Sequence, residues 1–206
     1  MLREARDIKR RRYLFDRPLR GLLFVLALFA SGFVSYPTFA QTPSQETTPA
    51  PTKDAFGEEM LLAGKPIVFI AGKATWENAF PTLVDKFKTI SAFLAKQNLK
   101  PAGAPLTIYT SVTDKGFEFQ AAIPLAEQPA NLPRGVVTAG QSPVGKALKF
   151  VHRGSYDSMD MLYETIVHYF DEKNIQKQGL FVEEYLTDPV TTPQDQLVVN
   201  VYVMVK

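Results

Sequence analysis

The feature that most constrains the fold of this chain is an internal similarity between two passages that lie 76 residues apart. Each passage contains an apolar strand, an amphipathic helix and two further strands in the same order, over about residues 64–126 and 143–206. The repetition predicts a duplicated β-α-β-β unit. Residues at equivalent positions keep their type, as in Phe80 and Tyr156, Phe87 and Tyr163, Ile90 and Ile166, Asn98 and Asn174, Gly103 and Gly179, and Tyr109 and Tyr185.

The repeated unit predicts the fold class. Each unit closes with two adjacent strands, so the sheet is expected to be largely antiparallel. We therefore predict an α+β fold of duplicated β-α-β-β units, with an antiparallel sheet, two helices on one face and a central ligand cleft. The expected strands are 66–71, 106–110 and 117–124 in the first unit and 145–151, 181–185 and 197–205 in the second, with helices at 81–97 and about 158–173.

The first forty residues have the composition of an export signal. Residues 1–20 hold eight basic and three acidic residues, a net charge of +5 in a chain whose total is +2. An apolar run follows at 21–34, and the small residues Thr38 and Ala40 match a cleavage site before Gln41. The alternative is an uncleaved membrane helix that keeps the N-terminus in contact with the membrane. Both interpretations predict a domain in the periplasm or cell envelope, either secreted or anchored to the inner membrane by the N-terminus.

Composition indicates where the folded domain begins and argues against several kinds of partner and cofactor. Residues 41–57 are rich in Pro and Thr, which predicts a linker before a folded domain at 58–206. Outside residues 1–20 the charge is mildly acidic, which argues against nucleic acid as a partner. The sequence has no cysteine and two histidines, His152 and His168, so we expect neither disulfides nor a metal centre. Because no phosphate loop or dinucleotide fingerprint occurs, we expect no cofactor.

Strand alternation brings polar and aromatic residues to the expected cleft. It places Phe181, Glu183 and Tyr185 on one face of their strand. Gln120 and Asn200 form an equivalent polar pair on the closing strands. An aromatic pocket around a carboxylate suits a hydrophobic, cationic or aromatic small molecule through stacking and cation–π attraction. The predicted ligand-binding residues are Trp76, Phe80, Tyr109, Gln120, Tyr156, Glu183, Tyr185 and Asn200.

The same residues also have a structural interpretation. Regularly spaced Tyr and Phe side chains form ordinary hydrophobic cores as well as pockets. Glu183 stands next to Glu184, and this pair is equally compatible with a buried acid and with a solvated strand face. His152 is interpreted as a structural side chain at the end of a strand, and Ser155 as a turn or helix-start residue.

Three segments resemble the GyrI-like family, which includes the effector-binding domains of AraC-type and MerR-type regulators. They are residues 151–157 (VHRGSYD), 183–189 (EEYLTDP) and, more loosely, 119–125 (FQAAIPL). The resemblance covers roughly residues 60–206. It implies a duplicated β-α-β-β fold with a central cleft for hydrophobic, often cationic or aromatic, small molecules. For some relatives it implies gyrase inhibition, and for a few it implies hydrolysis of cyclopropane-bearing compounds by pocket glutamates.

The resemblance also assigns roles to individual residues. The closing strands carry Gln120 and Asn200 where the family has acids, which reduces the number of pocket acids. The matching positions are Glu183 and Tyr185 for the family's Glu-x-Tyr pair, Tyr156 for its helix-start tyrosine, and His152 with Gly154 for its His-x-Gly turn.

Export and the resemblance leave three functions open. The first is a binding protein that buffers or senses an amphipathic compound. The second is a hydrolase of a reactive small molecule, with Glu183 as general acid or base. The third is a protein-interaction module. We expect an open cleft with Glu183 at its floor, whereas a cleft filled by its own side chains would favour the third function.

Overall fold

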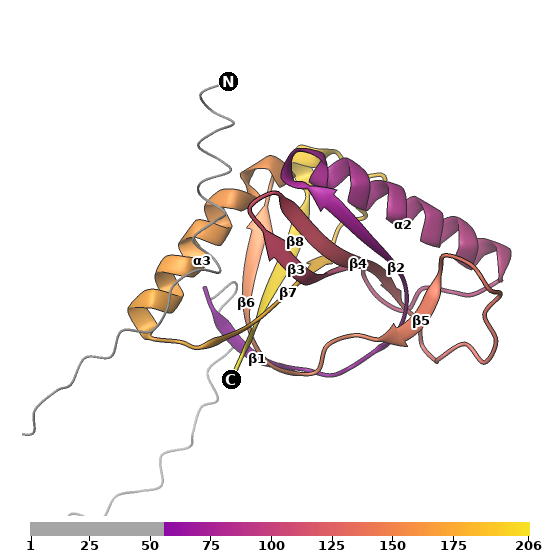
Figure 1. The fold of residues 1–206 in the computed structure, drawn as a ribbon, viewed down its shortest axis with the longest axis horizontal. Coiled ribbons are helices and arrows are strands. Elements are labelled where there is room, and N and C mark those ends of the chain that lie inside the picture. Colours follow the sequence, from indigo (N-terminus) through magenta and orange to yellow (C-terminus); the bar gives the residue numbers. More distant parts are fainter. Residues whose placement is uncertain (1–55) are drawn as a thin grey trace, which may run out of the picture. The chain divides into compact units, whose positions relative to one another are not determined.

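The computed structural model describes residues 56–206. The expected signal or anchor at 1–40 and the linker up to residue 55 lie outside the described residues. The described chain forms a sheet with two α-helices (Figure 1). The strands are β1 Glu58–Leu62, β2 Pro66–Thr75, β3 Leu106–Thr113, β4 Gly116–Pro124, β5 Thr138–Gln141, β6 Gly145–Arg153, β7 Lys177–Tyr185 and β8 Val198–Val205, and the helices are α2 Ala79–Lys96 and α3 Met159–Lys173.

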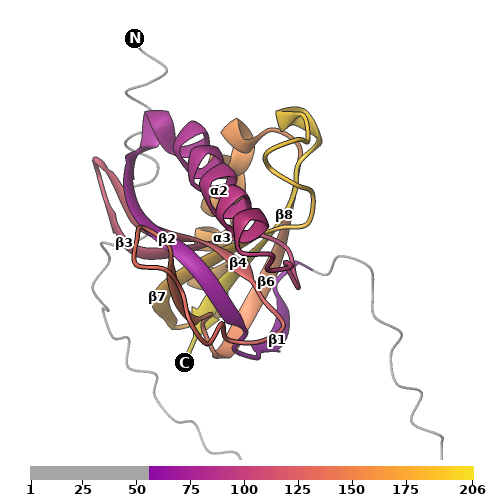
Figure 2. The same ribbon diagram turned by 90° about the vertical axis from the view of Figure 1, so that its right-hand side faces the viewer.

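The sheet confirms the predicted fold class. Its strand order is β1-β6-β8-β7-β3-β4-β2-β5, and all neighbouring strands are antiparallel. One unit contributes β2, β4 and β3, and the other contributes β6, β8 and β7. The two halves meet where β3 pairs with β7. Both helices lie over the same face of the sheet (Figure 1), and α2 runs across the strands of its own unit (Figure 2).

The junction of β3 and β7 is the centre of a two-fold arrangement. Thr107 lies directly opposite Glu183 in this antiparallel pair. These two residues are also equivalent under the 76-residue offset in the sequence. A residue faces its own equivalent only where a two-fold axis passes between them. Thr107 and Glu183 therefore mark the middle of the sheet.

Each unit has one strand more than the sequence predicts. β1 precedes the first unit but pairs with β6 of the second, and β5 precedes the second unit but pairs with β2 of the first. Three residues connect β1 to β2, and three connect β5 to β6. Such short connections span only about 10 Å, so the sheet must curl until its two ends approach each other. Lys65 and Ser142 join the two connections, because each backbone N–H donates to the other residue over 2.9 Å.

The helices form where the apolar periodicity predicts them. The apolar residues at spacing i, i+4, i+7 and i+11 on α2 are each at most 1% exposed; they are Leu83, Phe87, Ile90 and Leu94. An asparagine in the left-handed backbone conformation follows each helix: Asn98 with φ 54° after α2, and Asn174 with φ 52° after α3. The residue after each asparagine donates its N–H to a carbonyl of the last helical turn, as in Ile175 to Phe170 over 3.0 Å. This closure satisfies backbone groups at the helix end and turns the chain toward the next strand.

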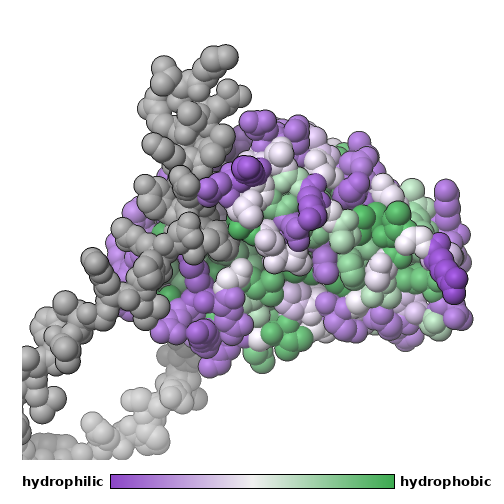
Figure 3. Space-filling model, in the orientation of Figure 1, coloured by the Kyte–Doolittle hydropathy of each residue, from purple (hydrophilic) through white to green (hydrophobic). Residues whose placement is uncertain are grey.

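Both faces of the sheet are buried. The helices cover one face, and the curl of the sheet covers much of the other. Apolar surface is visible in the half of the domain that carries α2, β4 and β5 (Figure 3). The core on the face away from the helices consists of Ile67, Leu106, Ile108, Ala122, Ala147, Val182, Tyr202 and Met204.

Candidate functional site

Glu183 lies at the centre of the sheet on the helix-covered face. It is fully buried, with an exposed fraction of 0%. Its position follows from strand alternation, because its neighbours Val182 and Glu184 turn to the other face. The sequence was compatible with a buried acid and with a solvated strand face, and the structure shows that Glu183 is a buried acid.

Three tyrosine hydroxyl groups donate hydrogen bonds to the Glu183 carboxylate. Tyr109 of β3 donates to Oε1 over 2.8 Å, and Tyr163 of α3 donates to the same oxygen over 2.7 Å. Tyr185 of β7 donates to Oε2 over 2.7 Å. The Tyr156 hydroxyl lies 3.3 Å from that of Tyr109 and extends the network. We call Glu183 and these four tyrosines the Glu183 cluster.

The electrostatics of the cluster keep its phenols protonated. Burial raises the pKa of Tyr109 well above its ordinary value, and the nearby Glu183 carboxylate raises it further. Burial and Glu183 raise the pKa of Tyr185 in the same way. Both phenols therefore remain hydrogen-bond donors at neutral pH, and donors of this kind stabilise a buried carboxylate.

Aromatic rings surround the cluster. Phe80 stacks on Tyr156 with ring centroids 4.9 Å apart, so two equivalent residues of the repeat meet here. Phe87, the equivalent of Tyr163, packs edge-on against Tyr185 at 5.4 Å. A buried carboxylate with aromatic walls is chemically suited to an organic cation, because the charge meets the acid and the apolar parts meet the rings.

Trp76 lies at the side of the cluster rather than against Glu183. Its ring packs on Phe117 at 4.9 Å, and Phe117 packs on Tyr109 at 5.0 Å. The Trp76 indole N–H donates to the Thr113 carbonyl oxygen over 3.0 Å. Trp76 is therefore coupled to the site through one intervening ring.

The turn between β6 and α3 positions Tyr156. The Nε2 atom of His152 donates to the Ser155 carbonyl oxygen over 2.9 Å, and the Ser155 hydroxyl accepts from the Asp157 N–H over 3.3 Å. Gly154 has a φ of 116°, and its N–H donates to the Leu197 carbonyl oxygen over 2.9 Å. These contacts confirm the structural interpretation of His152 and Ser155.

Gln120 and Asn200 do not join the Glu183 cluster. Gln120 stands between Phe119 and Ala121, which face the helices, so its own side chain points to the other face. Asn200 lies on that face too, where its Nδ2 atom is 3.2 Å from an oxygen of Glu184. We predicted that both residues line the same cleft as Glu183, but period-2 alternation places them on the face of the sheet opposite to Glu183.

The expected open cleft is replaced by a closed arrangement. Tyr109, Tyr185 and Glu183 are each at most 5% exposed, whereas Trp76 and Phe80 are half-buried. Tyr109, Tyr163 and Tyr185 surround the Glu183 carboxylate, and Phe80 stacks on Tyr156 beside them. A ligand must therefore displace aromatic side chains to reach the carboxylate, and the half-buried rings are the ones closest to solvent.

Two members of the site were not predicted as such. Helical periodicity places Tyr163 in the core stripe of α3 but does not show that its hydroxyl reaches Glu183. Thr107 stands at the repeat position equivalent to Glu183, but its full burial beside that residue comes from the β3–β7 pairing. The sequence does carry a sign of a polar role for Tyr163, because this tyrosine stands at the position where the first unit has Phe87.

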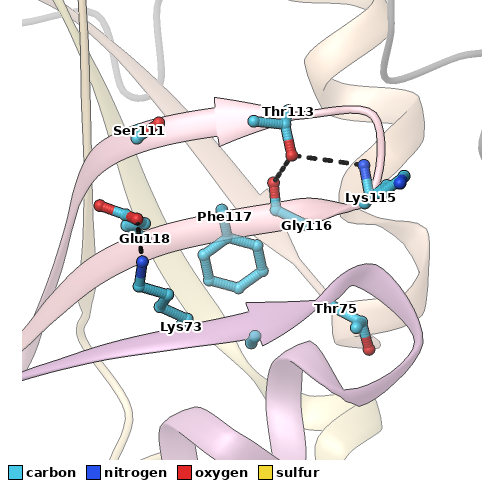
Figure 4. Close-up of a pocket in the computed structure, with 9 residues that line it drawn as sticks. Lys73, Thr75, Ser111, Thr113, Lys115, Gly116, Phe117 and Glu118 are labelled. Carbon is cyan, nitrogen blue, oxygen red and sulfur yellow. Dashed lines mark hydrogen bonds and ion pairs between the residues drawn. The ribbon is translucent and has the colours of Figure 1, made fainter.

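A separate shallow pocket of about 340 Å³ lies at the ends of β2, β3 and β4 (Figure 4). Its polar groups already bond one another, because Lys73 pairs with Glu118 at 2.5 Å and the Thr113 hydroxyl donates to the Gly116 carbonyl oxygen over 3.0 Å. Phe117 belongs to its lining and also packs on the ring of Tyr109 in the Glu183 cluster. Residues 56–206 contain no cluster of three metal-ligating side chains, and neither helix of this region is long and apolar enough to cross a membrane.

The family model of the GyrI-like small molecule binding domain matches residues 60–206. The chain belongs to this GyrI-like family. The match spans both units of the sheet and every residue of the Glu183 cluster, so the family resemblance found in the sequence is confirmed.

Solved structures share the GyrI-like fold at low sequence identity. The C-terminal domain of EcmrR has a TM-score of 0.62 at 13% identity, over 73% of this chain and 96% of that one. EcmrR in a DNA complex has a TM-score of 0.63 at 13% identity, over 73% of this chain and 57% of that one. SAV2435 bound to tetraphenylphosphonium has a TM-score of 0.52 at 14% identity, over 73% of this chain and 93% of that one. No curated protein sequence matches the chain.

Proposed function

We propose that this domain binds an amphipathic organic cation at the Glu183 cluster. The observation that carries the proposal is the fully buried Glu183 carboxylate, which accepts hydrogen bonds from Tyr109, Tyr163 and Tyr185. The closed site would by itself favour a protein-interaction module, by the expectation drawn from the sequence. A protein surface that docks on a closed site, however, would leave the buried Glu183 carboxylate unexplained. Burying a charged acid costs free energy that a purely structural core residue would avoid. A cation that enters the site recovers part of this cost through its charge, and its apolar groups replace the contacts of the displaced rings.

The similarity to SAV2435 supports this ligand class. That structure contains tetraphenylphosphonium, a permanently charged cation that carries four phenyl groups. The shared fold puts such a ligand in the class of molecules to test first on this chain. Entry requires movement of the half-buried Phe80 and Trp76, which flank the start of α2.

The cellular role we propose is to buffer or sense such a compound outside the cytoplasm. The support is the sequence of residues 1–40, with its basic stretch, apolar run and small residues before Gln41. N-terminal sequencing of the protein from cell-envelope material tests this role. A mature protein that begins at Gln41, or an intact chain recovered in the membrane fraction, supports it. An intact chain recovered from the cytosol contradicts it.

Fluorescence titration with tetraphenylphosphonium tests the binding function. Trp76 is the single tryptophan of the chain, and it contacts the ring that packs on Tyr109. We expect saturable quenching in the wild-type protein. We expect Glu183→Gln to weaken binding by about tenfold to a hundredfold, because it removes the buried charge while it keeps the shape.

The adjacent acid provides the matched control. Glu184 has the same side chain one position along β7 but lies on the other face, where the Tyr202 hydroxyl donates to it over 2.6 Å. Glu184→Gln should leave the affinity for tetraphenylphosphonium within about twofold of wild type. Equal affinities in wild type and Glu183→Gln, with both proteins folded, would disprove the proposal.

A further inference from the structure

We propose that the Thr107 hydroxyl is a specificity-determining contact of the Glu183 site, and that it selects cations that carry N–H groups, such as protonated primary amines. This inference rests on the proposed function and deepens it. It concerns which kind of cation the site prefers, whereas the proposed function requires only that a cation binds at Glu183.

The hydroxyl of Thr107 has no hydrogen-bond partner in the structure. Its oxygen is the one buried side-chain polar atom of residues 56–206 left without a partner. Thr107 is also fully buried, with an exposed fraction of 0%. Native proteins rarely leave such a group unsatisfied, because a desolvated hydroxyl without a hydrogen bond destabilises the fold. Valine has nearly the same shape without this cost, so the hydroxyl calls for an explanation in function.

The place of Thr107 in the sheet supplies that explanation. Thr107 lies directly opposite Glu183 in the β3–β7 pair, so their side chains project side by side toward the helices with Cβ atoms about 5 Å apart. On either side along the strands stand Tyr109 and Tyr185, which both bond to Glu183. The hydroxyl is thus part of the floor of the site, at the two-fold centre of the domain.

The chemistry of a hydroxyl allows an acceptor role toward the ligand. A threonine hydroxyl can both donate and accept a hydrogen bond, and the Thr107 oxygen has no partner within the domain. Its lone pairs can therefore accept from a donor on the ligand. A ligand N–H group placed beside Glu183 is such a donor.

Cation chemistry then separates two ligand types. A protonated amine carries both positive charge and N–H donors, so it can meet Glu183 and donate to Thr107. A quaternary ammonium or phosphonium ion carries the charge alone and gains nothing from the hydroxyl. Binding such an ion also leaves Thr107 unsatisfied, which gives the site a built-in preference for amines.

A matched pair of probes tests the inference on the full chain. The probes are 4-phenylbenzylamine and its N,N,N-trimethyl quaternary analogue, which share one aromatic scaffold and one positive charge at neutral pH. The variants are Thr107→Val, which removes the hydroxyl and keeps the shape, and Thr107→Ser, which keeps the hydroxyl. We expect Thr107→Val to bind the amine about tenfold more weakly and the quaternary analogue within twofold of wild type. Thr107→Ser should retain the wild-type preference for the amine.

The outcomes separate this inference from the proposed function. Thr107→Val should fold at least as stably as wild type, because it removes an unsatisfied group, so loss of folding is not expected to obscure the result. If Thr107→Val leaves both affinities unchanged or lowers both equally, while Glu183→Gln weakens both, the inference about Thr107 is wrong and the binding function stands. If Glu183→Gln leaves both affinities unchanged, the proposed function fails as well.

Discussion

At the scale of single residues, Glu183 and Glu184 show how one step along a strand changes the chemistry of an acid. Glu183 is enclosed by tyrosine hydroxyl groups on the helix-covered face. Glu184 accepts from Tyr202 on the other face and lies 3.9 Å from the Lys65 ammonium group. Its side chain keeps 16% of its surface exposed. The buried acid is therefore the one suited to an apolar cation, and the accessible acid ties the β1–β2 connection to the central strand.

The buried tyrosines predict a loss of stability at high pH. Tyr109 and Tyr185 have pKa values raised by burial and by Glu183, whereas a tyrosine in an unfolded chain has a pKa of about 10. The stability linked to their protonation is therefore complete below the unfolded pKa and declines as the pH rises from there toward the folded pKa. The expected slope is up to about 1.4 kcal/mol per pH unit for each tyrosine.

Urea unfolding at a series of pH values between 8 and 11 measures this dependence. Tyr109→Phe should show a shallower decline than wild type, because one of the shifted groups is absent. A decline as steep in Tyr109→Phe as in wild type would show that the linkage lies elsewhere.

At the scale of elements, the short additional strands join the two units. β1 (EEMLL) and β5 (TAGQ) each pair with the first strand of the opposite unit. Their sequences carry weak strand signals, and the five-residue and four-residue lengths give periodicity little to act on. They form strands because each finds an unpaired edge nearby, which is a property of the assembled sheet.

The start of β4 provides a test at this scale. Gly116 faces Thr75 at the end of β2, and a Cβ atom at Gly116 would lie 2.0 Å from the Ala74 carbonyl oxygen. We expect Gly116→Ala to lower the free energy of unfolding by about 3 kcal/mol, because the β2–β4 pair must separate to admit the methyl group. Chemical denaturation measures the effect.

Gly135 is the matched control for this substitution. A Cβ atom there meets no atom within 4 Å, so Gly135→Ala should change the free energy of unfolding by less than about 0.5 kcal/mol. Similar effects of the two alanine substitutions would contradict the close approach of β2 and β4.

At the scale of the whole molecule, the exchanged strands predict that the two units unfold together. β1 and β5 tie each unit to the other, and Lys65 and Ser142 join the connections that lead from them. The β3–β7 pair adds a second junction at the centre. Neither unit can therefore lose its structure without exposing the edges and core of the other.

Two spectroscopic signals test this cooperativity. Trp76 fluorescence reports on the first unit alone, because the chain has one tryptophan, and far-ultraviolet circular dichroism reports on both units. We expect coincident urea transitions. A fluorescence midpoint clearly separated from the dichroism midpoint would mean that the units unfold independently.

Some of the predicted site residues lie together in the structure, and others do not. Strand alternation placed Glu183 and Tyr185 on one face, and the repeat related Tyr109 to Tyr185; these three residues do meet. Alternation along the closing strands also placed Gln120 on one face with Glu118 and Ala122, and Asn200 on one face with Val198 and Tyr202. It did not fix which face turns toward the helices, because both faces of this sheet are largely apolar.

The α+β class, the order of the repeated elements and the buried faces of the helices were predictable from the sequence, because they depend on periodicities of apolar residues that are local along the chain. The position of Thr107 beside Glu183, the contact of Tyr163 from α3 with this acid and the closure of the site by aromatic rings were not predictable in this way. These features depend on strand register and on where two distant units meet. Such long-range pairings arise from packing among many residues, and no single segment encodes them.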